Sequence, residues 1–237
     1  LTLGGNNTYA GATTINAGTL EIGAAGRLGG GTYAGNIANT ATFLYSGTNN
    51  QILSGILSGN GSFAQNAAST LTLTGNNTNT GATTIYDGTI EIGATGRLGG
   101  GTYAGDIANT GVLIYSGTNN QTLSGILSGN GALTQNNTAT LTLSGNNTYT
   151  GTTTINAGTL AIGANMTMGA FAGTGNLSLG TGYTLTTNTS TTNTFSGLVI
   201  GNGALTKNGT GWLTLGGNNT YAGATTINAG TLEIGAA

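Results

Sequence analysis

The sequence repeats itself at a nearly constant interval, and this period limits the fold more than any other feature does. The segment LTLGGNNTYAGATTINAGTLEIG begins at Leu1, and variants of it begin at Leu71, Leu141 and Leu213. The first two intervals are equal, and the third is two positions longer. Self-similarity at a fixed period is the signature of architectures built from stacked units.

The segments between these copies also correspond to each other. GRLGGGTYAGNIANT begins at Gly26, and GRLGGGTYAGDIANT begins at Gly96. The third connecting segment, Ala164 to Val199, lacks GRLGGGTYAG, and its unit is the longer one. We therefore divide the chain into repeat units 1–70, 71–140 and 141–212 and a partial unit 213–237. A local change of loop is expected within residues 164–199, with the core continuing past it.

Short segments with the character of β-strands fill each unit. LTL, ATTINAG, TLEIG and TFLYSG alternate apolar residues with Thr or Ser and are bounded by Gly or Asn, a pattern typical of strands. No stretch has helical spacing, and the 47 glycines would each destabilise a helix by about 1 kcal/mol relative to Ala. The sequence therefore predicts an all-β protein.

The units run into one another without a linker, which favours a solenoid over separate domains. A solenoid needs no linkers because each coil buries its apolar face against the next coil. Apolar strand centres at Leu3, Ile22, Leu44 and Phe63 follow each other at nearly even intervals. We expect one continuous parallel β-solenoid over residues 1–237, with about three coils per 70-residue repeat. Leu, Ile, Val and Phe should point inward, and Asn and Gly should occupy corners that need positive φ.

Composition excludes several classes of partner. The chain has three basic and five acidic residues, a net charge of −2, and no His, Cys or Pro. Such a chain has no basic stripe for phosphates, so neither nucleic acid nor an anionic membrane surface is expected as a partner. Its apolar runs are far shorter than the roughly 20 residues that a membrane-spanning helix requires.

Catalysis is not expected either. The acidic residues are Glu21, Asp87, Glu91, Asp106 and Glu233, and the basic residues are Arg27, Arg97 and Lys207. Among the acids only Asp87 and Glu91 are close in sequence, and His and Cys, which serve most transition-metal sites and nucleophile relays, are absent. We assign no catalytic, cofactor-binding or metal-binding residue, and no cofactor.

One pair of charges recurs with constant spacing. The interval from Glu21 to Arg27 is the same as that from Glu91 to Arg97. In the third unit Ala161 replaces the Glu, and the Arg is missing as well. This paired loss predicts an exposed ion pair across a corner, worth under about 1 kcal/mol. A ligand site is the alternative.

Two further recurring features have both a structural and a functional interpretation. NNT at Asn6, Asn76, Asn146 and Asn218 matches the N-glycosylation acceptor pattern, but Asn-Asn also suits a corner, which we favour. Sugars can stack on tyrosines such as Tyr9, Tyr149 and Tyr221, although Asn79 replaces this Tyr in the second unit. A packing or corner role is the favoured interpretation of these tyrosines.

Threonine arrays raise the alternative of ice binding. ATTI or TTTI recurs once per repeat, which is every third coil, while the intervening coils carry TFLY or GSFAQ. A regular Thr grid on successive coils is not predicted, so ice binding remains a lesser alternative.

The stretch GNGALTKNGTGWLTLGGNNTYAGATTINAGTLEIG, from Gly201 to Gly235, resembles a known repeat family. It is similar to the autotransporter-associated β-strand repeat, also called the passenger-associated transport repeat, of secreted Gram-negative bacterial proteins. Similar stretches begin at Leu71 and Leu141. The resemblance implies a right-handed parallel β-helix passenger, exported across the outer membrane through a C-terminal β-barrel. It also implies a stalk or adhesin at the bacterial cell surface.

Two classes of function therefore remain open. One is a structural module that gives an extracellular protein or fibre length and stiffness, and the other is a module that binds glycans or host cells. The segment LTLGGNNTYAGATTINAGTLEIGAA stands at both ends of the chain. We expect the native object to continue in both directions, within a longer polypeptide or by end-to-end stacking of copies. The expected partners are thus neighbouring repeats or further copies, and surface glycans.

Overall fold

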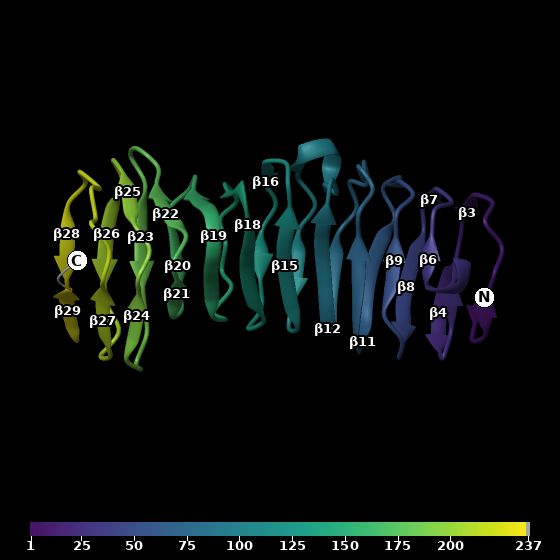
Figure 1. Cartoon of the computed structure of the whole chain (residues 1–237), viewed down its shortest axis with the longest axis horizontal. Helices are drawn as coiled ribbons and strands as arrows, with labels where there is room; N and C mark the ends of the chain where they lie inside the picture. The colour runs from purple at the N-terminus through teal and green to yellow at the C-terminus, as the bar shows by residue number, and fades with distance from the viewer. Residues whose placement is uncertain (236–237) are drawn as a thin grey trace.

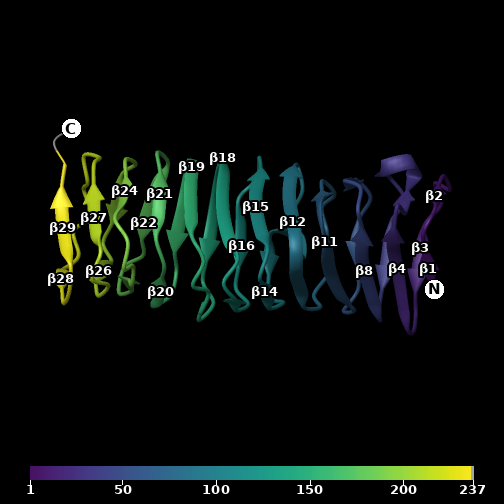
Figure 2. The same cartoon turned by 90° about the horizontal axis from the view of Figure 1, so that it is seen from below.

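The computed structural model describes residues 1–235, which form one long stack of parallel coils (Figure 1). The N-terminus lies at one end of the stack, β29 lies at the other, and the strands follow each other along the long axis in both views (Figures 1 and 2). The stack has about 12 turns, and no α-helix occurs within residues 1–235. The all-β parallel solenoid predicted from the sequence is confirmed.

The strands are short and are interrupted by two 3₁₀ turns, η1 (Gly29–Gly31) and η2 (Gly99–Gly101). In chain order the strands are β1 (Thr2–Leu3), β2 (Asn6–Asn7), β3 (Thr13–Ile15), β4 (Thr19–Ala24), β5 (Arg27–Leu28), β6 (Thr32–Tyr33), β7 (Ile37–Asn39), β8 (Thr42–Gly47), β9 (Gln51–Leu53), β10 (Leu57–Ser58), β11 (Ser62–Leu73), β12 (Thr83–Ala94), β13 (Thr102–Tyr103), β14 (Ile107–Asn109), β15 (Val112–Gly117), β16 (Gln121–Leu123), β17 (Leu127–Ser128), β18 (Ala132–Leu143), β19 (Thr153–Ile162), β20 (Met166–Met168), β21 (Phe171–Gly173), β22 (Asn176–Leu179), β23 (Thr184–Thr187), β24 (Asn193–Phe195), β25 (Val199–Gly201), β26 (Ala204–Lys207), β27 (Trp212–Leu215), β28 (Thr225–Ile227) and β29 (Thr231–Ile234). None of the described residues forms a helix that is long and apolar enough to cross a membrane.

The strand register shows how the 70-residue repeat relates to the coils. Leu3 pairs with Ile22, Ile22 with Tyr45, and Tyr45 with Gln65. Three full coils therefore lead from Leu3 to Gln65, whereas one full repeat leads from Leu3 to Leu73. The predicted value of about three coils per repeat is thus confirmed, and the segment from Gln65 to Leu73 is left over.

This remainder moves each repeat onto a new face of the solenoid. Residues that pair with one another in successive coils form a column along the rod. Leu73, the counterpart of Leu3, lies beyond the end of the third coil, and its column continues through Ile92 to Tyr115. The coil that begins at Asn109 therefore holds one residue from each of three columns. Asn109 belongs to the column of Leu3, Tyr115 to that of Leu73, and Leu123 to that of Leu143. Successive repeats are rotated by about a third of a turn.

The two 3₁₀ turns make this rotation visible. They occupy equivalent positions in the first two repeats. The coiled ribbon of η2 stands at the upper edge in Figure 1, whereas that of η1 stands at the upper edge in Figure 2, a quarter turn away. A surface feature carried once per repeat is therefore displayed on different sides of the rod.

The third repeat has a different phase because its coils are shorter. The coil from Ile92 to Tyr115 contains GRLGGGTYAG and is longer than the coil from Ile155 to Gly173, which lacks this segment. As a result Leu215 falls in the column of Leu73, seven coils later. The third repeat thus spans about a third of a coil more than the others. The loop changes in this region while the parallel stack continues through it.

The core differs from the sequence-based expectation in its large residues. Leu, Ile and Phe point inward as predicted, and Phe43 stacks on Phe63 with ring centroids 5.6 Å apart. Tyrosines share this interior, and several are among the largest fully buried side chains of residues 1–235: Tyr33, Tyr45, Tyr103, Tyr115 and Tyr149. Their hydroxyl groups reach polar atoms at the corners, which allows a polar tip to end a buried ring.

Two buried glutamines take the place of backbone pairing where the longer coils, which carry GRLGGGTYAG, depart from the parallel strand pairing. The Gln121 Oε1 accepts the Leu98 N–H at 2.9 Å, and the Gln121 Nε2 donates to the Leu98 carbonyl at 3.1 Å. Gln51 makes the same two bonds to Leu28 in the first repeat. A side-chain amide has the same donor and acceptor as a peptide group, so it satisfies backbone groups that would otherwise be buried alone.

Glycines at the corners allow neighbouring coils to approach closely. A Cβ added at Gly145 would lie 2.1 Å from the Gly125 carbonyl oxygen of the coil before it. Asn was also expected at corners because of positive φ, and this expectation is wrong. Among residues 1–235 the non-glycine residues with positive φ are Ala24 and Ala94. Asparagines serve the corners through side-chain hydrogen bonds instead.

The glycine spacing predicts that Gly145→Ala lowers the free energy of unfolding by about 1–3 kcal/mol, because the methyl group overlaps a fixed backbone carbonyl. The matched control is Gly5→Ala. Gly5 is the counterpart of Gly145 in the first repeat, and an added Cβ there meets no atom within 4 Å. Urea unfolding followed by circular dichroism measures both variants. Equal losses of stability in the two would show that coil contact is not the cause.

Candidate functional site

The five acidic residues all serve as hydrogen-bond acceptors for neighbouring groups. Glu21 Oε2 accepts the Thr2 hydroxyl at 3.0 Å and Glu21 Oε1 accepts that of Ser46; these bonds, Ser46 first, hold the pKa of Glu21 below its usual value. The others are engaged in the same manner: Asp87 by the Gly88 N–H, Glu91 by Ser116, Asp106 by the Ile126 N–H and Glu233 by Thr214. Within residues 1–235 no three His, Cys, Asp or Glu side chains form a metal-binding group.

The predicted pairing of Glu21 with Arg27 is wrong. Glu21 lies in β4 and binds hydroxyl groups of the coils on either side. Arg27 lies beyond the corner in β5, and its Nη2 donates to the Asn49 Oδ1 at 2.6 Å. Each side chain is thus hydrogen-bonded to a residue about one coil away in the sequence. Such a residue lies beside it in the stack, whereas Glu21 and Arg27 are separated by a corner.

The NNT motif closes a corner, and its two asparagines differ. The first, as at Asn76 and Asn146, is exposed. The second accepts a backbone N–H from the coil before it: Asn77 from Leu57 at 2.8 Å, and Asn147 from Leu127 at 2.7 Å. These bonds give the motif the structural role that we favoured, while N-glycosylation of the exposed asparagine stays an alternative.

In each full repeat the same threonine is hydrogen-bonded to a tyrosine hydroxyl, and two different positions in the sequence supply that tyrosine. In the first repeat both positions do so, because Tyr9 is also bonded to Thr13, at 3.3 Å. Tyr33 and Tyr103 belong to GRLGGGTYAG, and their hydroxyls are hydrogen-bonded to Thr13 at 2.7 Å and Thr83 at 2.8 Å. The third repeat lacks that segment. Its Thr153 is hydrogen-bonded at 2.8 Å to Tyr149, which lies four residues earlier in the chain.

The counterparts of Tyr149 show that this position changes with the surrounding loop. Tyr149 is 1% exposed, whereas Tyr9 in the first repeat is 40% exposed. Burial raises the pKa of Tyr149 and raises the pKa of Tyr103 to about 12. Tyr149 therefore packs in the interior and offers no face on which a sugar can stack.

This exchange predicts that Tyr149→Phe lowers the free energy of unfolding by about 1–3 kcal/mol, because Thr153 would keep a buried hydroxyl without a partner. In the control, Tyr9→Phe, the exposed Tyr9 hydroxyl is removed from Thr13, but Thr13 keeps its bond to Tyr33. A change within about 0.5 kcal/mol is therefore expected. Urea titration of both variants measures the difference. A loss in Tyr9→Phe as large as that in Tyr149→Phe would contradict this account.

One charged side chain is buried where the earlier repeats have a neutral amide. Gln65 and Gln135 donate from Nε2 to carbonyl oxygens of their own corners, Gln135 to Ala139 at 2.6 Å. Lys207 occupies the equivalent position, is fully buried, and donates from Nζ to the Gly209 carbonyl. Desolvation lowers the pKa of the Lys207 ammonium. Comparing GALTQN with GALTKN in the sequence shows that a charge replaces an amide at this position, but the comparison does not show that the position is buried.

The Lys207 environment predicts that Lys207→Gln raises the free energy of unfolding by about 1–3 kcal/mol at neutral pH, since an amide replaces a poorly solvated charge. The folded-state pKa of Lys207 is below its ordinary value of 10.5, so the unfolded chain binds this proton more tightly. The penalty is fully present below the folded pKa and disappears as the pH rises toward 10.5.

Urea titrations between neutral pH and pH 10.5 measure this dependence. The native chain should gain stability over the upper part of that range, and Lys207→Gln should lack this part of the gain. A variant that is no more stable than the native chain at neutral pH would refute the argument.

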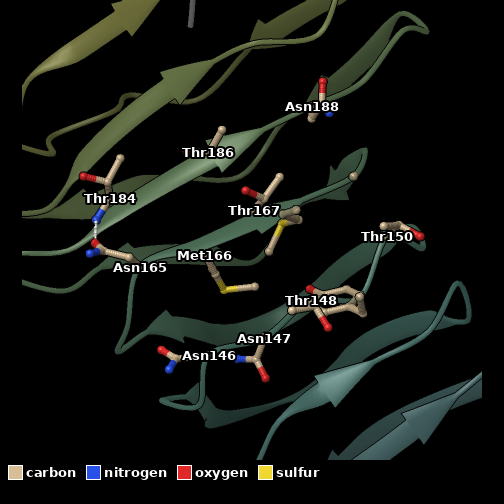
Figure 3. A pocket seen from close by; sticks show the side chains of 13 residues that line it. Asn146, Asn147, Thr148, Thr150, Asn165, Met166, Thr167, Thr184, Thr186 and Asn188 are labelled. Atoms are coloured by element: carbon tan, nitrogen blue, oxygen red, sulfur yellow. Dashed lines mark hydrogen bonds between the residues drawn. The ribbon is translucent and has the colours of Figure 1, made fainter.

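A groove lies where the third NNT segment faces the next coil (Figure 3). Its volume is about 580 Å³, within the range of roughly 300–1,000 Å³ typical of ligand sites. Residues 146–150 form one wall, and β20 with the start of β23 forms the other. None of its 13 lining residues is charged; they include Asn146, Asn147, Thr148, Thr150, Met166 and Met168.

Comparisons with known proteins found one family and one relative that this chain resembles. The passenger-associated transport repeat family matches residues 1–22, 68–92, 133–162 and 205–234. The chain is also similar to the adhesin BmaC autotransporter of Brucella suis biovar 1 (strain 1330), with 38% identity over 203 residues. That alignment covers 76% of this chain and spans 6% of the adhesin. No solved structure matches the chain.

Proposed function

The chain is a passenger-associated transport repeat protein, and on that premise we propose that it forms a stiff extended segment of an exported bacterial adhesin. In this role the solenoid carries adhesive surfaces away from the cell. The observation that best supports the proposal is the unbroken parallel stack of about 12 turns. Coils about 4.8 Å apart give this stack a length of roughly 55 Å.

The side-chain chemistry is consistent with a mechanical and adhesive role and not with catalysis. The acidic groups are spread along the rod and accept structural hydrogen bonds. The charge of −2 leaves a nearly neutral surface of amides and hydroxyls. Such a surface suits weak contacts, repeated many times, with neutral groups such as those of surface glycans.

The rotation of successive repeats supports adhesion from several sides. Leu3, Leu73 and Leu143 lie in three different columns, so the surface of each of these repeats faces a different direction. We propose that neighbouring repeats of the same polymer continue the rod, and that other cells meet it from any side. End-to-end stacking of separate copies is the alternative route to the same rod.

A length measurement tests the stalk role. Because residues 213–237 repeat residues 1–25, copies can be joined so that this segment is shared. Each added copy then contributes about ten coils and should lengthen the rod by about 50 Å. Electron microscopy of chains with one, two and three copies measures the increment, and compact or kinked particles would contradict a stiff stalk.

The adhesive role needs a separate measurement. Beads coated with the chain should bind to host-cell layers, and binding should increase with the number of joined copies. Beads coated with an equal mass of an unrelated neutral β-protein are the control. Binding no greater than that control would leave a stalk without adhesion.

A further inference from the structure

The groove in the third repeat exists because a backbone closure is missing there. In the second repeat the Asn77 N–H donates to the Arg97 carbonyl at 2.9 Å, and the Gly100 N–H donates to the Asn77 carbonyl at 2.7 Å. In the first repeat β2 pairs with β5 in the same way. Residues 146–150 make no corresponding backbone bond to β20 within the described part of the chain. The parallel ladder is thus open at this point, and the groove fills the gap.

An unused hydrogen-bond donor stands at the wall of this groove. The Nδ2 atoms of Asn7, Asn77 and Asn219 each donate to the glycine carbonyl two residues earlier, at 2.7, 3.0 and 2.7 Å. Asn147 is the counterpart in the third repeat and is 4% exposed, and its buried Nδ2 has no partner. A buried donor without a partner costs about 1–3 kcal/mol, which a ligand oxygen can recover.

The lining is suited to a neutral ligand that carries many hydroxyl groups. Asparagine amides and threonine hydroxyls both donate and accept hydrogen bonds, as sugar hydroxyls do. Met166, which is 5% exposed, adds a small adaptable apolar surface for C–H groups, whereas Met168 is fully buried. No lining residue is charged, so an anionic or cationic ligand would lose its hydration without gaining an opposite charge.

The rim of the groove continues along the rod. Thr167 pairs with Thr186, Thr186 with Thr206, and Thr206 with Thr226, so one outward column carries threonine on four successive coils. Neighbouring hydroxyls in such a column recur about every 4.8 Å. This threonine column favours an elongated ligand that crosses several coils over a single sugar.

We propose that this groove, together with the threonine column, binds a neutral oligosaccharide. The proposal rests on the adhesive role proposed above and assigns that role one specific site. The Asn147 Nδ2 donates to a ligand oxygen, Met166 contacts C–H groups of a sugar, and the threonines hold the oligosaccharide along the rod. Among the three full repeats, residues 1–212, the third alone has such a site, because GRLGGGTYAG closes the same position in the first two.

Binding is tested by isothermal titration of the whole chain with cellohexaose, maltohexaose and laminarihexaose. A galacturonate hexamer tests for an anionic ligand, and a neutral Thr-Ala-Gly hexapeptide tests for an added β-strand. We expect at least one neutral oligosaccharide to bind and the other two probes not to bind. No binding of any neutral oligosaccharide at millimolar concentration, or tighter binding of the acidic sugar or the peptide, would overturn the proposal.

Matched variants locate the site. Thr148→Trp fills the groove and should weaken binding by about tenfold or more, whereas Thr78→Trp, its counterpart in the second repeat, should leave binding unchanged. Thr150→Trp with Thr80→Trp as its control repeats the comparison if Thr148→Trp unfolds, which a thermal melt detects. Equal effects within a pair that stays folded would place the site elsewhere.

The bead assay separates this site from the adhesive function as a whole. If Thr148→Trp no longer binds the oligosaccharide and beads coated with this variant no longer adhere to host cells, the groove is an adhesive site of the rod. Loss of oligosaccharide binding with unchanged adhesion would overturn the link between them while leaving the proposed stalk and adhesin intact.

Discussion

The parallel backbone ladder between coils is the interaction on which the rest of this structure depends. From β1 to β29, strands pair their peptide groups with those of the coils before and after them. The ladder explains the absence of proline, which has no N–H to donate. It also explains the glycines, because corners such as Gly145 bring two backbones too close for a Cβ. Because this backbone pairing joins the coils, few ion pairs are needed between them, and the chain has only eight charged side chains.

Some of the polar side chains in the interior bind groups that this ladder leaves without a partner. Gln51 and Gln121 bind both backbone groups of the residue at which the long coil departs. Tyr103 and Tyr149 show that one threonine position can be served from two places in the sequence, depending on the loop that is present. In the third repeat the exchange is incomplete, because the Asn147 Nδ2 has no partner and a groove remains.

The mismatch between the repeat and the coil has consequences for function. A repeat of a whole number of coils would place every copy of a feature on one face and build a ladder of identical residues. The segment left over after three coils distributes the copies over three faces. The shortened coils of the third repeat change this phase. The threonine column from Thr167 to Thr226 begins in the same repeat. The ATTI or TTTI segment, which recurs once per repeat in the sequence, does not predict that column.

The sequence by itself determined the period, the all-β parallel solenoid, the inward Leu, Ile and Phe residues, and the resemblance to bacterial passenger repeats. These follow from local alternation and self-similarity, which need no knowledge of what lies beside each strand. The face on which each repeat lies, the separate partners of Glu21 and Arg27, the burial of Lys207 and the groove beside Asn147 were decided by the tertiary structure. The physical reason is that neighbours lie one coil away, and the length of a coil varies with the loop that it carries. Until that length is known, the sequence does not show which side chain faces which.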